Sequence, residues 1–216
     1  MRPLTYERDP DAIYRQSFAT VAAESDLSAL APSMHPVATR LIHACGMVEI
    51  APLVTVSDDA VQAGLAALRR GAPILCDARM VEMGIIARLL TAAATHAPSP
   101  VITTLNEAEV PALAQRIGNT RSAAAVELWR PRLDGAIVVI GNAPTALFHL
   151  LELLDEGWPK PALILGFPVG FVGAAESKAE LVADPRGVPF MTLRGRQGGS
   201  AIAAAAVNAL AVEAAR

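Results

Sequence analysis

Hydrophobic positions fall into short uninterrupted runs separated by longer, periodic segments. Five runs are apolar at almost every position: PILCD (73–77), VITTL (101–105), AIVVIG (136–141), ALILG (162–166) and FMTLRG (190–195). Runs of this kind are typical of strands that are buried on both faces of a sheet. A helical pattern follows each run, and strands that alternate with helices form parallel β-α-β units. The pattern therefore predicts an α/β fold, a three-layer α/β/α sandwich with a mainly parallel sheet.

The remaining segments predict helices before and after this region. Asp9-Pro10 is typical of a helix start, because proline lacks the N–H that the first helical turn leaves unpaired. A second helix is expected around residues 37–45, with Gly46 as its left-handed end. An extended segment is expected at 50–56 and is followed by a third helix. The alanine-rich carboxyl end is expected to be a helix that packs closely on the sheet.

Composition limits the class of protein. The chain has 216 residues, of which 53% are hydrophobic, and it contains no linker-like tract, so one domain over 1–216 is expected. No apolar run reaches the roughly 18 residues of a membrane span, and no export signal is evident at the amino terminus. Cys45 and Cys76 match no metal-ligand spacing and suit a reducing compartment, which favours the cytoplasm. A net charge of -3 argues against a nucleic-acid partner.

Glycines and arginines gather after the predicted strands. Ligands of parallel sheets bind beyond the carboxyl ends of the strands, and glycine-rich turns that lead into helices direct backbone N–H groups at anions. The candidate ligand contacts in these turns and in the segment RIGNTRSAA are Arg79, Arg116, Asn119, Arg121, Gly166, Gly170, Gly173, Arg194 and Arg196. Each glycine could instead serve a tight turn, and single arginines are often solvated. Several such turns together favour a polyanionic ligand.

His43 is the candidate proton-transfer residue. It lies in the stretch ATRLIHACGM, and helical spacing places Arg40 and Met47 on its face, away from the apolar face of the same helix. An imidazole exchanges protons near neutral pH, so this position suits acid or base chemistry on a bound ligand. The alternative is a partly buried structural histidine, which the pattern alone does not exclude.

Common catalytic and nucleotide motifs are missing from the sequence. The glycines at 166, 170 and 173 have the spacing G-x-x-x-G-x-x-G, which is not a dinucleotide fingerprint, and no phosphate-loop motif occurs. H-E-x-x-H, G-x-S-x-G and C-x-x-C are missing too. Dehydrogenase, phosphate-loop, zinc hydrolase and serine hydrolase functions are all disfavoured.

Five longer segments resemble one family over nearly the whole chain. RLIHACGMVE, GNTRSAAAVELW, GNAPTALFHLLELL, GFPVGFVGAAESK and RGRQGGSAIAAAAVNAL are similar to the precorrin-8X methylmutases of cobalamin biosynthesis. The resemblance implies that a methyl group migrates from carbon 11 to carbon 12 of precorrin-8X to give hydrogenobyrinic acid, without metal or organic cofactor. It assigns the catalytic histidine to His43 and substrate contacts to Ser17 and Arg40. It also implies a homodimer with sites near the subunit interface.

The resemblance leaves three points open. Residues 85–100 differ from the family's usual stretch, which carries a threonine near position 86, so no contact is assigned there. The substrate could be cobalt-precorrin-8 rather than the metal-free tetrapyrrole. A tetrapyrrole-binding module without chemistry would also carry many of these features.

Overall fold

The computed structural model describes residues 4–216 and contains a six-stranded sheet of order β1-β6-β5-β4-β2-β3. The strands are Val54–Val56 (β1), Ile74–Cys76 (β2), Val101–Thr103 (β3), Ile137–Ile140 (β4), Leu163–Gly166 (β5) and Phe190–Leu193 (β6). β2 to β6 pair in parallel, and β1 pairs antiparallel with β6 at one edge. The predicted, mainly parallel sheet is confirmed.

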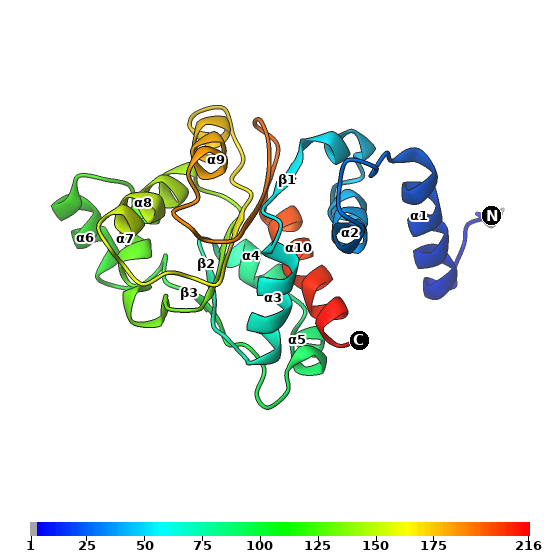
Figure 1. The fold of residues 1–216 in the computed structure, drawn as a ribbon, viewed down its shortest axis with the longest axis horizontal. Coiled ribbons are helices and arrows are strands. Elements are labelled where there is room, and N and C mark those ends of the chain that lie inside the picture. The colour runs from blue at the N-terminus through cyan, green and yellow to red at the C-terminus, as the bar shows by residue number, and fades with distance from the viewer. Residues whose placement is uncertain (1–3) are drawn as a thin grey trace.

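Helices cover both faces of the sheet (Figure 1). One face carries α3 (Ala60–Arg69), α4 (Arg79–Gly84), α5 (Ala87–Ala93) and α10 (Ser200–Ala214), with α2 (His35–Cys45) packed on α10 and α1 (Pro10–Glu24) packed on α2. The other carries α6 (Val110–Ile117), α7 (Arg121–Glu127), α8 (Pro144–Asp155) and α9 (Ala174–Ala183). Short 3-10 helices span Pro32–Met34, Val48–Leu53 and Arg130–Arg132. The three-layer sandwich is confirmed, with α1 and α2 added outside it.

The core is divided by the sheet into two hydrophobic clusters. In β4, Ile137 and Val139 belong to the cluster under α3 and α10, whereas Val138 and Ile140 belong to the cluster under α8. Successive side chains of a strand point to opposite faces, so a strand covered on both sides needs apolar residues at every position. This is why the strands appear in the sequence as uninterrupted apolar runs.

Helix α10 lies between the sheet and α2. It packs against α2, α3, α4 and α5, and nine of its residues are buried. A helix surrounded in this way must be apolar on all sides, and alanine allows its neighbours to approach closely. At Gly84, at the end of α4, an added Cβ would lie 2.7 Å from Cβ of Ala204. The prediction of a closely packed alanine-rich helix is confirmed.

The helix ends agree with the sequence, but one extended segment does not. Asp9 caps α1 by accepting a hydrogen bond from the N–H of Asp11 at 3.1 Å, and Gly46 ends α2 with a φ of 69°. The extended segment predicted at 50–56 is wrong over its first part, because residues 50–53 complete a 3-10 helix and only β1 is a strand. Pro52 has no N–H to give to a sheet, which favours the turn there.

Candidate functional site

The strand order of the parallel sheet reverses between β2 and β4. In sheets of this type the carboxyl ends of two such strands border a crevice where ligands bind. Asp77, directly after β2, is buried there and accepts hydrogen bonds from the backbone N–H groups of Gly141, Asn142 and Ala143 at 2.8 to 2.9 Å. Burial raises the pKa of Asp77, and these three donors oppose that rise. Asp77 therefore holds the turn after β4 and has no free oxygen to spare for a ligand.

A histidine-centred cluster lies on the α10 side of the sheet, where α1 and α2 meet. His43 is exposed, and its Nδ1 lies 2.7 Å from Oγ of Ser17 on α1. Tyr14 stacks on the imidazole with ring centroids 5.5 Å apart, and Phe18 meets it edge-on at 5.2 Å. The Arg40 guanidinium lies 5.2 Å from the centre of the Phe18 ring. The ring of His43 is thus held in one orientation by two aromatic side chains and one hydroxyl.

A cavity of about 280 Å³ opens beside this cluster. It is lined by Tyr14, Arg40, His43, Ala44, Gly84, Ile86, Leu89, Ala201, Ala204, Ala205 and Asn208. Residues 201, 204, 205 and 208 share one face of α10 by helical spacing, so small side chains form a flat apolar wall. Such a wall suits a planar, largely apolar ligand whose charged groups lie at its edge, where Arg40 is placed.

Asn208 is the polar residue of that wall. Its Oδ1 accepts a hydrogen bond from the N–H of Ile86 at 2.8 Å, and its Nδ2 donates to the carbonyl oxygen of Gly84 at 2.9 Å. One side chain therefore joins α10 to the turn between α4 and α5, which forms another wall of the cavity. This turn begins the segment 85–100, for which the resemblance assigned no substrate contact.

The structure corrects one part of the prediction for α2. Arg40 lines the same cavity as His43, as the helical spacing predicted. Met47 does not share that face, because α2 ends at Cys45 and Met47 packs against the core. The left-handed Gly46 turns the chain away before Met47 is reached.

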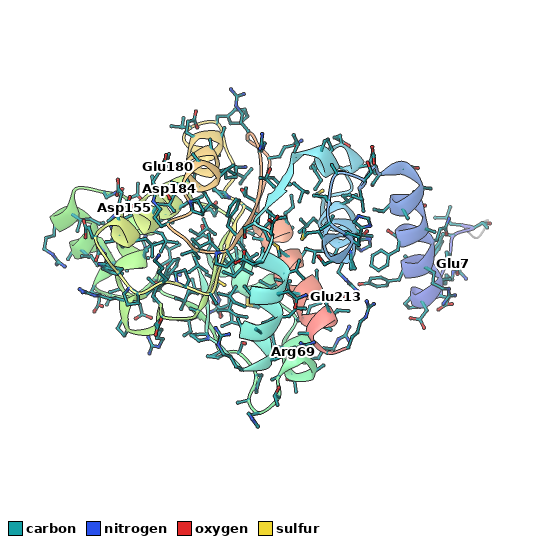
Figure 2. All side chains as sticks on the ribbon, in the orientation of Figure 1. Glu7, Arg69, Asp155, Glu180, Asp184 and Glu213 are labelled. Atoms are coloured by element: carbon teal, nitrogen blue, oxygen red, sulfur yellow. The ribbon has the colours of Figure 1, made fainter. Side chains whose placement is uncertain are left out.

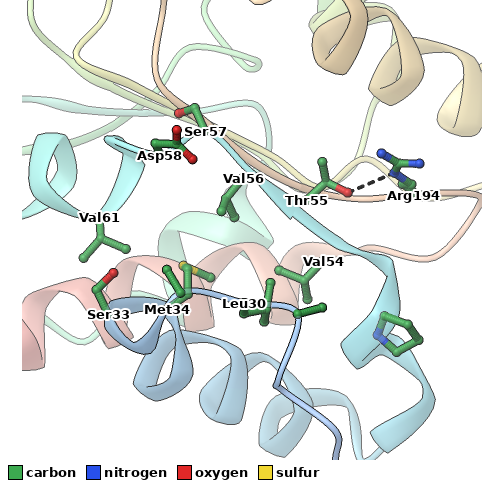
Figure 3. Close-up of a pocket in the computed structure, with 13 residues that line it drawn as sticks. Leu30, Ser33, Met34, Val54, Thr55, Val56, Ser57, Asp58, Val61 and Arg194 are labelled. Carbon is green, nitrogen blue, oxygen red and sulfur yellow. Dashed lines mark hydrogen bonds between the residues drawn. The ribbon is translucent and has the colours of Figure 1, made fainter.

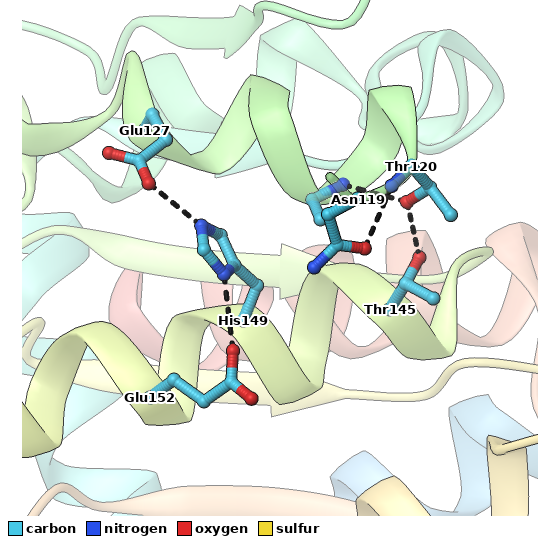
Figure 4. Close-up of polar contacts among 7 residues, drawn as sticks. Asn119, Thr120, Glu127, Thr145, His149 and Glu152 are labelled. Atoms are coloured by element: carbon cyan, nitrogen blue, oxygen red, sulfur yellow. Dashed lines mark hydrogen bonds and ion pairs between the residues drawn. The ribbon is translucent and has the colours of Figure 1, made fainter. Parts of the chain in front are cut away.

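The segment around α6 and α7 is separated by the sheet from α2, the helix that carries His43 (Figure 1). Arg116 and Asn119 are exposed, and Arg121 donates to the carbonyl oxygen of Leu105 at 3.2 Å. Figure 4 shows Asn119 and Thr120 at the start of α7, with Thr120 Oγ1 lying 2.8 Å from Thr145 Oγ1 of α8. These three predicted contacts do not line the cavity at His43.

The same two helices are joined by a hydrogen-bonded cluster further along. His149 on α8 lies 2.8 Å from Glu127 of α7 and 3.2 Å from Glu152 on its own helix (Figure 4). Its two ring nitrogens are both engaged, so His149 serves to hold α7 against α8.

The remaining predicted contacts lie along the carboxyl edge of the sheet. Arg79 is exposed and pairs with Glu82 at 3.2 Å. Gly166 is buried, and a Cβ there would lie 2.8 Å from Leu181, so its lack of a side chain is explained by packing. Gly170 and Gly173 have φ angles of 139° and 80°, which favour glycine. The guanidinium of Arg196 lies 5.5 Å from the ring of the exposed Phe171.

Arg194 borders a second, larger cavity of about 550 Å³ (Figure 3). Its Nε donates to Thr55 Oγ1 at 3.1 Å, and the cavity extends along β1 to the loop around Met34. Neither Arg194 nor its cavity meets His43. The structure therefore brings together Ser17, Arg40 and His43, and places the other predicted contacts outside the lining of this cavity.

Several residues of the site were not predicted. Tyr14 and Phe18 lie one turn apart on α1, and Tyr14 and Gly84 line the cavity. For Asn208 the sequence holds a signal, because it is the one polar side chain within the run AIAAAAVNALAV. An amide inside a buried helix needs hydrogen-bond partners, and such a residue is a candidate for bridging two elements. Tyr14 and Phe18 gave no comparable signal, since aromatic residues on a helix are usually core.

Two further kinds of site are not seen in the part of the chain that the structure describes. Within residues 4–216, no group of three or more His, Cys, Asp or Glu side chains is placed to hold a metal ion. No helix between residues 4 and 216 is both long and apolar enough to cross a membrane.

The doubly wound sheet and the cavity define a class, an α/β protein with a histidine and an arginine beside an apolar wall. Comparison with known proteins identifies the family within this class. The precorrin-8X methylmutase family matches residues 12–213. A precorrin-8X methylmutase of Pseudomonas aeruginosa is 62% identical over 210 residues, covering 97% of this chain and 99% of that protein. One from Sinorhizobium sp. is 56% identical over 206 residues, 95% of this chain and 96% of that protein.

More distant relatives carry a related name, and a solved structure has the same fold. A cobalt-precorrin-8 methylmutase of Priestia megaterium is 36% identical, covering 98% of this chain and 90% of that protein. The crystal structure of precorrin-8X methylmutase from Thermus thermophilus superposes with a TM-score of 0.84 at 40% identity, covering 95% of this chain and 96% of that one. This chain belongs to the precorrin-8X methylmutase family and is an isomerase, as the resemblance implied.

Proposed function

We propose that this chain converts precorrin-8X to hydrogenobyrinic acid by methyl migration from carbon 11 to carbon 12, with His43 as the proton-transfer residue. The observation that carries the assignment of His43 is its bond to Ser17 at 2.7 Å beside a cavity that Arg40 also lines. Family membership supports the reaction, and this geometry supports the residue.

Ser17 determines which nitrogen of His43 can react. Nδ1 is engaged by the hydroxyl, so Nε2 is the ring nitrogen without a hydrogen-bond partner in the described chain, residues 4–216. In the charged ring, Nδ1–H donates to Ser17 and Nε2–H is available to protonate the ligand. After transfer, the neutral ring keeps its proton on Nδ1 and the same bond to Ser17. The proton thus moves without rearrangement of the pair.

The reaction balances without any other reactant. Substrate and product are isomers, so no proton is gained or lost overall. The proton that His43 gives to the macrocycle therefore returns to His43 before the catalytic cycle ends. Protonation draws electrons through the conjugated ring, and the methyl group migrates with its bonding pair from carbon 11 to carbon 12. The step is formally a sigmatropic shift, so catalysis requires orientation of the macrocycle and one proton. The flat wall of α10 and the imidazole supply these two requirements.

The metal-free substrate is favoured over cobalt-precorrin-8. The relatives named for precorrin-8X are 62% and 56% identical to this chain, whereas the Priestia megaterium cobalt-precorrin-8 methylmutase is 36% identical. Both substrates carry the same acetate and propionate carboxylates. The site residues therefore do not separate them, and the substrate must be tested directly.

A homodimer would give α1 a partner. Val21 is the one buried residue of this helix, while Ile13 is 46% exposed and Tyr14, which lines the cavity, is 51% exposed. Exposed apolar side chains next to a site favour a protein contact there, and the family implies sites near a subunit interface. Light scattering at micromolar concentration should give the mass of two chains, and a monomer would contradict this. We also place the protein in the cytoplasm, where two unbonded cysteines are expected.

The decisive test of function is turnover. The purified protein should convert precorrin-8X, followed by its absorption spectrum, over many turnovers per chain. Conversion of cobalt-precorrin-8 at an equal or higher rate would overturn the substrate assignment. Stoichiometric binding of both tetrapyrroles without conversion would overturn the catalytic proposal itself.

A further inference from the structure

Lys178 on α9 is a buried cation that the proposed reaction does not use. Its side chain belongs to the segment GFPVGFVGAAESK, and the residue is 1% exposed. Nζ donates one hydrogen bond, to the backbone carbonyl oxygen of Gln197 in the loop after β6. An ammonium carries three N–H groups, and a buried charge is costly unless it is paired.

Lys178 has no acidic partner among the described residues, 4–216. On its own helix, Glu176 is exposed and Glu180 pairs with Arg186 at 2.8 Å. Figure 2 shows Glu180 beside Asp155 of α8, which also pairs with Arg186, at 2.9 Å.

The charged groups on the other neighbouring segments do not neutralise it either. On α8, His149 and Glu152 pair with each other at 3.2 Å. In the loop after β6, Arg194 and Arg196 have the same sign as the ammonium, and β6 itself carries no titratable side chain. Burial lowers the pKa of Lys178 to about 8.

The bond from Lys178 lies where two loops are joined. The loop after β5 (167–173) and the loop after β6 (194–199) exchange backbone hydrogen bonds, from the N–H of Gly199 to Phe167 at 2.8 Å and from the N–H of Gly170 to Arg196 at 3.3 Å. A Cβ on Gly198 would collide with the carbonyl oxygens of Phe167 and Pro168. The 194–199 loop carries Arg194 and Arg196 and leads into α10, whose Ala201 lines the His43 cavity, whereas the 167–173 loop leads into α9.

We propose that Lys178 is a positioning residue that holds the 167–173 and 194–199 loops together, and that the carboxylates of the bound tetrapyrrole supply the negative charge that the protein does not provide. This rests on the proposed function, because it requires a polycarboxylate ligand near these loops. An apolar side chain would fill the same space at lower cost, so a buried unpaired ammonium indicates a role in function. Ligand binding then favours the protonated form of Lys178, and binding weakens when that proton is lost.

The sequence allows a direct measurement, because Lys160 is the other lysine of the chain and is exposed. Labelling lysine with ¹³C at Cε gives two resonances, which Lys160→Arg assigns. We expect the Lys178 resonance to titrate at about 8 in the free protein and about one unit higher with saturating hydrogenobyrinic acid. Affinity for hydrogenobyrinic acid should fall roughly tenfold from pH 7 to pH 9.5. An unchanged pKa in the complex would overturn the proposed charge compensation.

Variants separate this role from simple packing. Lys178→Met should bind hydrogenobyrinic acid on the order of tenfold more weakly at pH 7 and lose the pH dependence, while Lys160→Met should match the wild type. Lys178→Arg keeps its charge at every pH and should bind without the alkaline loss. Wild-type affinity in folded Lys178→Met would overturn the proposal.

A ligand-free measurement distinguishes this proposal from the proposed function. Hydrogen exchange at the amides of Gly170 and Gly199 should be faster in Lys178→Met than in the wild type. If the wild type does not bind hydrogenobyrinic acid, the proposed function fails, and exchange still decides whether Lys178 holds the loops. Equal exchange rates in Lys178→Met and the wild type would overturn the proposal that Lys178 holds the two loops together.

Discussion

Ser17 Oγ and His43 Nδ1 lie 2.7 Å apart and join α1 to α2 across 26 residues of sequence. The bond depends on α1, whose one buried residue is Val21. Ser17 of the proposed proton-transfer pair therefore lies on a helix that is packed weakly against the rest of the protein. The distance between Ser17 and His43 should depend on any contact that immobilises α1.

Replacing His43 should separate binding from turnover. His43→Ala should fold and bind hydrogenobyrinic acid, because Arg40 and the wall of α10 are unchanged, but lose on the order of 10² to 10⁴ in single-turnover conversion of precorrin-8X. His96→Ala, in an exposed loop, is the matched control and should behave as the wild type. Near wild-type conversion by folded His43→Ala would end the proton-transfer hypothesis.

Replacing Ser17 should have a smaller effect of the same kind. Ser17→Ala leaves the imidazole between Tyr14 and Phe18 but removes the bond that orients Nδ1, so kcat should fall about 10-fold with little change in KM. Thr20→Ala is the control, because Thr20 lies on the same helix and bonds only within it. A rise in KM at constant kcat would assign Ser17 to substrate binding instead.

Removing the amide of Asn208 should loosen one wall of the cavity. Asn208→Ala leaves the N–H of Ile86 and the carbonyl of Gly84 without this partner, so the free energy of unfolding should fall by about 1–3 kcal/mol. Affinity for hydrogenobyrinic acid, measured by titration of the folded variant, should fall with it. Thr91→Ala, which removes a bond within the neighbouring helix α5, should leave affinity unchanged. Equal affinities in the two variants would mean that this wall does not contact the ligand.

Arginine at the carboxyl edge should make binding depend on salt. Arg196→Ala should weaken binding of hydrogenobyrinic acid by about 3- to 10-fold at low ionic strength and reduce the salt dependence, because carboxylate–guanidinium contacts are partly screened. Arg132→Ala removes an exposed guanidinium from the short helix before β4 and serves as the control. Identical salt dependence in wild type and Arg196→Ala would exclude Arg196 from the ligand.

Lys178 should make folding stability rise with pH in the alkaline range. Its pKa is about 8 in the folded protein, below the usual value of 10.5, so the unfolded chain binds more protons between these two pH values. The free energy of unfolding of the wild type, relative to Lys178→Met, should therefore increase by about 1–3 kcal/mol from pH 8 to pH 10.5. Urea unfolding of both proteins at pH 7, 9 and 10.5 measures this difference. A constant difference would show that the ammonium is solvated.

The sequence by itself determined most of the helices and strands and the class of fold. Uninterrupted apolar runs marked β2 to β6, because a strand covered on both faces has no solvent-facing position. Asp9-Pro10 and Gly46 marked helix ends, because proline and glycine act through the backbone of the residue itself. The family motifs and the helical spacing of Arg40 and His43 likewise depend on nothing outside their own segments.

Only the tertiary structure decided which of these segments meet. It placed β1 antiparallel at the sheet edge, brought Asn208 to Ile86 across 122 residues, and left α7 on the other face of the sheet from α2. The sequence pattern within one segment indicates which residues are buried and where the backbone turns. A contact between distant segments depends instead on the packing of the whole chain. For this reason the shared face of Arg40 and His43 was predictable from sequence, whereas the cavity beside them was not.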